Sequence, residues 1–132
     1  GSAEMSIFVS YAYQDSQKVE ELLSRLKEVQ VSGWLDQADI AYGDEISSVL
    51  RDSLSKASAV LVLISPASLR SRWVELEVSA GQSLGKVIIP VIIRGEGIEN
   101  ELPLSIADIM YIDARKKSLD EVASEIKRVV ST

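Results

Sequence analysis

Trp73 and Glu77 are the residues whose types and spacing point most directly to chemistry. Ser71 is a favourable N-cap, so the sequence predicts a helix that carries Trp73 in its first turn. At about 100° per residue, Glu77 falls on the apolar face of this helix, one turn after Trp73, whereas Glu75 points the other way. A carboxylate on an apolar face is costly to bury unless it is paired, capped or functional. Glu77 is therefore either satisfied by a neighbouring base or a functional acid.

The composition limits what such an acid can do. The chain has no histidine and no cysteine, which excludes disulfides, thiol nucleophiles, Cys/His zinc sites and Ser-His-Asp catalysis. The formal net charge of −6 argues against general binding to a nucleic-acid backbone. We expect no metal site and no cofactor, so any catalysis must use carboxylates, hydroxyls, aromatic rings and backbone groups.

Further candidates stand near the ends of predicted strands. Ser10 and Tyr11 follow the first apolar run, and Tyr13 lies in the loop after it. The two tyrosines could stack on a base or a nicotinamide ring, or simply pack against neighbouring loops. Asp36 closes the second predicted strand, where it could contact a ligand or bond to the loop that follows.

An α/β framework must position these residues. Five apolar runs alternate with amphipathic helical segments, which predicts one doubly wound, flavodoxin-like parallel sheet with helices on both faces. For the strand order 2-1-3-4-5, a ligand would bind between strands one and three, beyond their carboxyl ends. Pro90 predicts a bulge or a partly unpaired edge, and residues 94–105 are expected to be a polar loop. The strands are expected at 7–11, 34–36, 59–64, 87–93 and 109–113.

Local signals set the expected ends of the helices. Asp15 or Ser16 should cap the first helix, and Gly33 should break it near its end. Ser118 and Glu121 form a capping box that should open the last helix.

Several segments, taken in chain order, share the pattern of one family. They are Ile7–Tyr11 with Asp15, Asp36 with Asp39–Asp44, Leu63–Ser65 with Ser71–Trp73 and Glu77, Pro90, and Tyr111–Arg115. Together they resemble the boxes of the Toll/interleukin-receptor (TIR) domain, and the second group resembles its BB loop. Val74 stands where many relatives carry cysteine, and the Phe-Trp pair of animal receptor domains is absent. The chain therefore resembles a bacterial or archaeal TIR domain.

The resemblance implies one of two functions. Many such domains cleave NAD at the nicotinamide–ribose bond, and the glutamate four residues after the tryptophan, which is Glu77 here, is catalytic in them. The product would be ADP-ribose or a cyclic isomer. The alternative is a non-catalytic module that signals through TIR–TIR contacts. On the first reading, the expected substrate-binding residues are Ser10, Tyr11, Tyr13, Asp36, Tyr42 and Trp73.

Elementary chemistry favours NAD cleavage for a site with one carboxylate. The cationic nicotinamide ring leaves as a neutral heterocycle, so no general acid is needed, whereas an ordinary glycosidase must also protonate a leaving oxygen. Glu77 alone could stabilise the oxocarbenium-like transition state and bond to ribose hydroxyls.

The length of 132 residues suits one domain. Residues 1–5 are expected to be a cloning scar and linker, and residues 6–132 the TIR domain. No apolar run is long enough to cross a bilayer, so we expect a cytoplasmic protein with no membrane contact. By resemblance, we expect a sensor domain in the full-length protein, a role in bacterial antiviral defence, and activation by self-assembly into an oligomer or filament through the BB loop.

Overall fold

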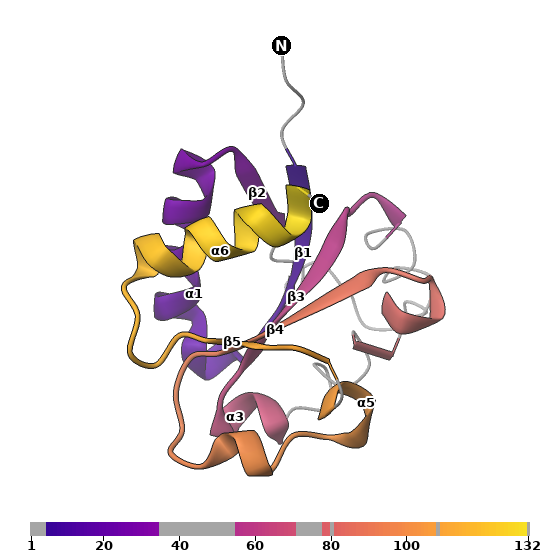
Figure 1. Ribbon diagram of the computed structural model, residues 1–132, viewed down its shortest axis with the longest axis vertical. Helices are drawn as coiled ribbons and strands as arrows, with labels where there is room; N and C mark the ends of the chain where they lie inside the picture. The colour runs from indigo at the N-terminus through magenta and orange to yellow at the C-terminus, as the bar shows by residue number, and fades with distance from the viewer. Residues whose placement is uncertain (1–4, 35–54, 71–77, 80, 108, 132) are drawn as a thin grey trace.

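The computed structural model describes residues 5–34, 55–70, 78–79, 81–107 and 109–131 (Figure 1). Four residues that the sequence singles out, Asp36, Tyr42, Trp73 and Glu77, lie outside the described residues. The expected second helix, which would begin at Asp44, also lies almost entirely outside them.

Five parallel strands form one sheet in the order β2-β1-β3-β4-β5. This confirms the predicted doubly wound order. Every residue of the third strand is buried, as its unbroken apolar run predicts. The strands are β1 (Met5–Ser10), β2 (Val31–Trp34), β3 (Ala59–Ile64), β4 (Val87–Ile92) and β5 (Ile112–Asp113).

The two long described helices, α1 (Ser16–Glu28) and α6 (Leu119–Ser131), lie side by side against the sheet (Figure 1). Short helical turns lie in the described connections that follow β1, β3 and β4. They are η1 (Tyr13–Asp15), α3 (Pro66–Leu69), η3 (Ile98–Asn100) and α5 (Leu104–Ala107). Residues 78–79 and 81–83 are also helical. The expectation that 94–105 is a plain loop was wrong, because η3 and the start of α5 fall within it. None of the helices in the described parts of the chain has the length and apolar character that crossing a bilayer requires.

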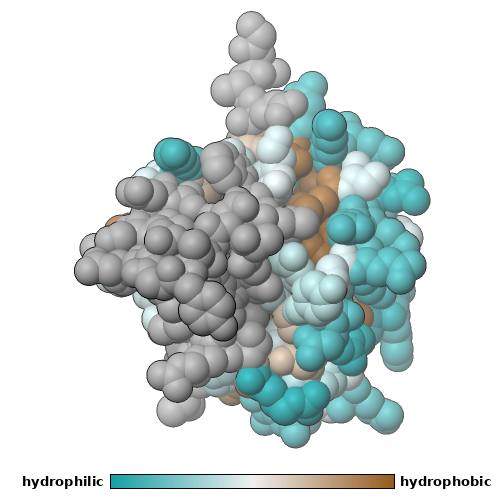
Figure 2. Space-filling model, turned by 180° about the vertical axis from the view of Figure 1, so that it is seen from behind, coloured by the Kyte–Doolittle hydropathy of each residue, from teal (hydrophilic) through white to brown (hydrophobic). Residues whose placement is uncertain are grey.

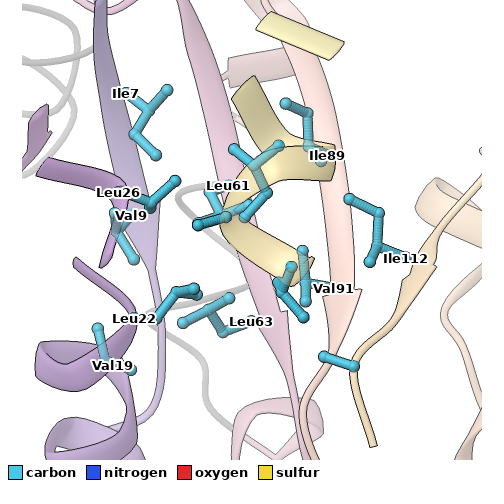
Figure 3. Packing of buried hydrophobic residues seen from close by; sticks show 14 of the residues in the cluster. Ile7, Val9, Val19, Leu22, Leu26, Leu61, Leu63, Ile89, Val91 and Ile112 are labelled. Atoms are coloured by element: carbon cyan, nitrogen blue, oxygen red, sulfur yellow. The ribbon is translucent and has the colours of Figure 1, made fainter. Parts of the chain in front are cut away.

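Two apolar clusters make up the described core. Alternate residues of a strand point to opposite faces of the sheet, so Ile7 and Val9 pack with α1 and α6, whereas Phe8 packs on the other face with Val78. Figure 3 shows the first cluster, in which strand residues lie against one face of α1. The α1 residues in that cluster are Val19, Leu22 and Leu26, at the helical spacing that the sequence predicts.

Gly33 has a different role from the predicted one. The first helix ends at Glu28, and Gln30 makes the turn into β2 with a φ of 66°. Gly33 lies inside β2, where an added Cβ would stand 2.1 Å from Leu23 Cδ2. The missing side chain at Gly33 leaves room for Leu23 of α1, and the expectation that Gly33 breaks α1 was wrong.

The proline in β4 leaves the β3–β4 pairing intact. Pro90 stands opposite Val62 in a continuous register, so no bulge forms. Described pairing between β4 and β5 begins only at Val91, so β4 is unpaired on that side at Pro90. The partly unpaired edge is confirmed. The fifth strand is shorter than expected, since Met110 is exposed and precedes it.

The capping box of the last helix is confirmed. The Glu121 backbone N–H donates to Ser118 Oγ at 3.2 Å, and the Ser118 N–H donates to Glu121 Oε1 at 3.4 Å.

Seen from behind in Figure 2, the described surface is mostly hydrophilic with one hydrophobic band. This fits a chain in which 26% of the residues are charged.

Candidate functional site

Polar residues gather where β1, β3 and β4 end. Ser10 is the last residue of β1, Ser65 follows β3, and Arg94 follows β4 at a distance of two residues. In a doubly wound parallel sheet, ligands bind beyond the carboxyl ends of the strands where the strand order reverses. For this sheet that point is the junction of β1 and β3.

The carboxylate of Asp15 joins the loops that follow these three strands. Arg94 Nε donates to Asp15 Oδ1 at 2.7 Å, and Ser65 Oγ donates to Asp15 Oδ2 at 2.5 Å. Asp15 is 5% exposed, whereas the Arg94 side chain is 48% exposed. A nearly buried carboxylate with an ion pair and a second donor is satisfied on both oxygens, as burial of a charge requires.

Ser65 links this network to the start of α3. Its hydroxyl also accepts from the Ser68 backbone N–H at 3.1 Å, and the Ser65 N–H donates to Ser68 Oγ at 2.8 Å. This reciprocal pair is a capping box, and Pro66 occupies the first turn as helix starts favour. One hydroxyl therefore caps α3 and holds Asp15.

Sequence reasoning did not place Asp15 in the site. Asp15 or Ser16 was expected as the helix cap. Asp15 occupies the N-cap position of α1, but it makes no side-chain cap hydrogen bond. The signal that could have found it is an acid in the loop directly after the first strand of a doubly wound sheet.

Ser10 is fully buried, and its hydroxyl has no hydrogen-bond partner. This sets it apart from the other buried side-chain polar atoms in the described part of the chain. Strand alternation places its side chain on the same face as Phe8, the face against which Val78 packs. An unsatisfied buried hydroxyl costs about 1–3 kcal/mol, so it calls for a physical explanation.

The two tyrosines after β1 have different environments. Tyr11 is buried in the apolar cluster beneath α1 and α6, as the packing alternative describes. Tyr13 is 80% exposed, so its ring is accessible for stacking. Ser10, Tyr11 and Tyr13 are thus neighbours along the chain, but Tyr11 points to the opposite face of the sheet from Ser10.

A separate open cavity of about 910 Å³ lies beyond the ends of β4 and β5. Arg94 is the link between this cavity and the Asp15 network. Of the predicted site residues that the structure describes, Ser10, Tyr11 and Tyr13, none lines it. The lining residues are Ile93, Arg94, Gly95, Glu96, Gly97, Glu99, Asn100, Asp113, Arg115 and Lys116.

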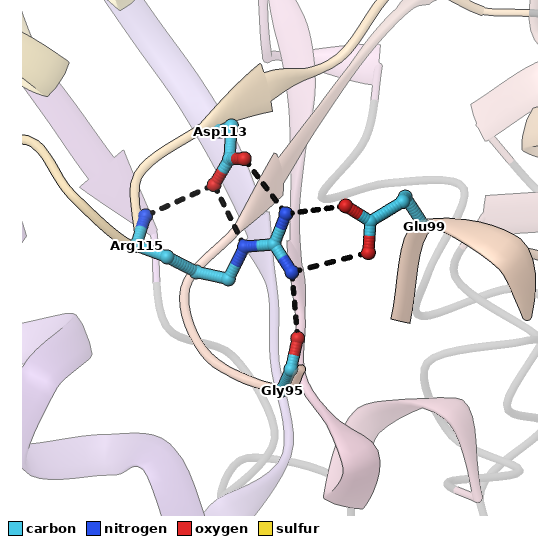
Figure 4. Close-up of polar contacts among 4 residues, drawn as sticks. All are labelled: Gly95, Glu99, Asp113 and Arg115. Carbon is cyan, nitrogen blue, oxygen red and sulfur yellow. Dashed lines mark hydrogen bonds and ion pairs between the residues drawn. The ribbon is translucent and has the colours of Figure 1, made fainter. Parts of the chain in front are cut away.

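Arg115 lines this cavity, and its guanidinium group is hydrogen-bonded to three residues of the protein, Asp113, Glu99 and Gly95 (Figure 4). Its Nε and Nη2 bind Asp113, its Nη1 and Nη2 bind Glu99, and its Nη1 also donates to the Gly95 carbonyl at 2.7 Å. All five N–H groups of the guanidinium are therefore used. The hydrogen bonds from Arg115 lower the pKa of Asp113 to about 2 and also lower that of Glu99. This clamp secures the loop between β4 and η3 and leaves no donor of Arg115 for a ligand.

The fold and the polar edge define a flavodoxin-like α/β domain with a candidate site at its switch point. The chain belongs to the TIR domain family, whose family model matches residues 7–130. It is 28% identical over 137 residues to an NAD(+) hydrolase of Theionarchaea archaeon (strain DG-70-1), with 98% of this chain and 41% of that protein covered. It is 25% identical over 134 residues to a 2′ cyclic ADP-D-ribose synthase of Bacteroides thetaiotaomicron, with 96% and 46% covered.

Among solved structures, the TIR domain of a Toll-related receptor from Hydra magnipapillata superposes with a TM-score of 0.77 at 20% identity. The match covers 96% of this chain and 98% of that one. The likeness supports the fold. The chain spans less than half the length of the two curated relatives.

Proposed function

We propose that this domain is an NAD glycohydrolase that cleaves the nicotinamide–ribose bond of NAD. The observation that carries the proposal is similarity over nearly the whole chain to two prokaryotic TIR relatives. One is named as an NAD(+) hydrolase and the other as a 2′ cyclic ADP-D-ribose synthase. Cleavage of the nicotinamide–ribose bond would account for both names, so we take it as the shared chemistry, with ADP-ribose or a cyclic isomer as the product.

The bond electrons leave with nicotinamide, which departs as a neutral ring. Water, or a nucleophile within the same molecule, then bonds to the ribose carbon and releases a proton. Glu77 is the proposed catalytic residue, because its carboxylate would stabilise the positive charge that develops on the ribose. Its predicted place on the apolar face of a helix at the switch point is the sequence argument for this role.

The described edge of the sheet offers suitable substrate contacts. The unpartnered Ser10 hydroxyl lies on the face against which Val78 packs, and Val78 directly follows Glu77 in the chain. The exposed ring of Tyr13 offers a stacking surface. Tyr11, Asp36, Tyr42 and Trp73 remain proposed substrate-binding residues on the grounds given by the sequence.

Self-assembly is proposed as the trigger for activity. NAD is long, and one loop of a domain this small would leave one side of it open, so a second subunit would exclude water and complete the site. The BB loop residues Ile40 and Tyr42 are the proposed contacts, and head-to-tail contact of this kind builds filaments. The greater length of the curated relatives supports a further domain in the full-length protein, which we propose to be the sensor of a cytoplasmic defence protein.

The test is nicotinamide release per molecule, measured against protein concentration with and without a fused oligomeriser. The proposal predicts turnover that rises with concentration and with forced assembly. A constant turnover over a hundredfold range would refute the assembly requirement. Undetectable release even from the fused oligomer would favour the non-catalytic signalling module.

A further inference from the structure

Arg94 belongs both to the Asp15 network and to the lining of the open cavity beyond β4 and β5. A guanidinium group carries five N–H donors, and the Nε donor of Arg94 binds Asp15. The other four donors, on Nη1 and Nη2, make no hydrogen bond within the described part of the chain. Since the Arg94 side chain is about half exposed, the protein fixes one edge of the guanidinium and leaves its other end open to a ligand.

A second cation lines the same cavity. Lys116 lies in the loop between β5 and α6, where it is exposed and has no hydrogen bond or ion pair to a described residue. Its neighbour Lys117, by contrast, is paired with Glu125. Arg94 and Lys116 therefore follow the carboxyl ends of two paired strands, which is the edge at which α/β domains bind ligands.

Two of the acids in the lining are already paired. Asp113 and Glu99 each bind Arg115 through both carboxylate oxygens (Figure 4). Among the described residues that line the cavity, Glu96 is the acid outside this clamp. The donors that remain open on the lining side chains therefore belong to cations, and cationic donors suit an anionic ligand.

The cavity has room for the middle part of a dinucleotide. Its volume of about 910 Å³ lies within the range of about 300–1,000 Å³ that is usual for ligand sites. Gly97 lines it, and a Cβ added there would meet no atom within 4 Å. Through Asp15, Arg94 is also bonded to η1, the turn that carries the exposed ring of Tyr13. The cavity is thus joined to a described part of the proposed substrate site.

We infer that this cavity binds the diphosphate of NAD, with Arg94 Nη1 and Nη2 and the Lys116 ammonium group as donors to its phosphate oxygens. The inference rests on the proposed function for the identity of the ligand. A guanidinium suits phosphate because two parallel N–H groups can bind two of its oxygens. The bond from Nε to Asp15 orients the group before a ligand arrives, which favours binding. ADP-ribose carries the same diphosphate and should bind in the same place.

ADP-ribose binding to the 132-residue chain, measured by calorimetry, tests the site without any reaction. Inorganic pyrophosphate carries only the diphosphate, and adenosine lacks it, so these two probes show which part of the ligand is bound. The variants are Lys116→Gln and Arg94→Gln, which each remove a cation, and Glu96→Gln, which removes an acid. Arg128→Gln is the matched control, because Arg128 is an exposed base on α6 that does not line the cavity.

Lys116→Gln should weaken ADP-ribose binding about two- to fivefold, as expected for one exposed charge. Arg94→Gln should weaken it about tenfold or more, as expected for hydrogen bonds between charged groups. Glu96→Gln should strengthen it, because a negative charge leaves the lining. Pyrophosphate should compete with ADP-ribose, adenosine should not, and the KM for NAD should shift in the same directions as the ADP-ribose affinity.

Arg94→Gln also removes a partner of the buried Asp15, so its affinity is measured below the melting temperature of the variant. Lys116 and Glu96 are exposed and lie outside the Asp15 network, so their variants decide the question even if Arg94→Gln does not fold. Unchanged affinity in both of them, or an equal loss in Arg128→Gln, would overturn the inference. So would wild-type protein that binds neither ADP-ribose nor pyrophosphate.

The same measurements separate this inference from the proposed function. If the wild type cleaves NAD, but Lys116→Gln and Glu96→Gln keep its KM and its affinity for ADP-ribose, the proposed function stands and the diphosphate site is refuted. If the wild type releases no nicotinamide even when fused to an oligomeriser, yet binds ADP-ribose with the expected order of variants, the diphosphate site stands and the proposed function is refuted.

Discussion

Replacing Ser10 with alanine separates a substrate contact from a structural serine. The Ser10 hydroxyl is buried and without a hydrogen-bond partner. Such a group destabilises a fold by about 1–3 kcal/mol, and its removal opens a void of only one oxygen atom. We therefore expect the free energy of unfolding of Ser10→Ala to be unchanged or higher by up to about 2 kcal/mol.

The same change should weaken substrate binding if the hydroxyl meets NAD. A neutral hydrogen bond contributes about 0.5–1.5 kcal/mol, which corresponds to an increase in KM of about 2- to 12-fold. Chemical denaturation and NAD kinetics measured on the same preparation give both quantities. Higher or equal stability together with a raised KM is the expected pattern.

Ser68→Ala provides the matched control for stability. Ser68 is also buried, but its Oγ accepts from the Ser65 N–H at 2.8 Å and donates to the Ser65 carbonyl at 3.1 Å. Its removal leaves partners unsatisfied and should cost about 1–3 kcal/mol. A comparable loss in Ser10→Ala would refute the reasoning on stability. Unchanged kcat and KM would remove Ser10 from the substrate site.

Three further substitutions test the described packing and electrostatics. Gly33→Ala should lower the urea midpoint by the equivalent of about 1–3 kcal/mol, because the new Cβ meets Leu23 Cδ2 at 2.1 Å. Gln30→Gly should raise the melting temperature by a few degrees, since glycine adopts the φ of 66° without strain. Arg115 lowers the pKa of Asp113 from 3.8 to about 2, so this carboxylate stabilises the fold above about pH 4, and the contribution is lost as pH falls toward 2. Asp113→Asn should flatten that pH dependence by no more than about 1 kcal/mol, because the side chain is 44% exposed.

Much of the sheet could be predicted because burial on both faces leaves an unbroken apolar run, as in β3. The residues at which β2 and β5 begin could not be predicted in this way. The turn at Gln30 depends on a left-handed residue that is not glycine, and Met110 is apolar yet exposed. Apolar character alone cannot show which residues find a partner strand.

From the sequence, only those site residues that stand at the ends of predicted strands could be identified. The position of Ser10 at the end of β1 follows from the apolar run before it. The role of Asp15 does not, because its partners Ser65 and Arg94 are far away in the sequence and meet it only through the parallel sheet. A helix-cap signal and a network residue look alike until the fold brings the three loops together.

The most direct test of the central claim is nicotinamide release from NAD by the wild type, Glu77→Gln and Glu75→Ala, each fused to the same oligomeriser. Glu77→Gln retains the size of the side chain and removes its charge, so the account predicts a folded protein with no detectable release. Glu75→Ala should keep nearly full activity, because Glu75 is predicted to lie on the opposite face of the helix from Glu77. Equal losses in the two variants, or full activity in Glu77→Gln, would contradict the assignment of Glu77 as the catalytic residue.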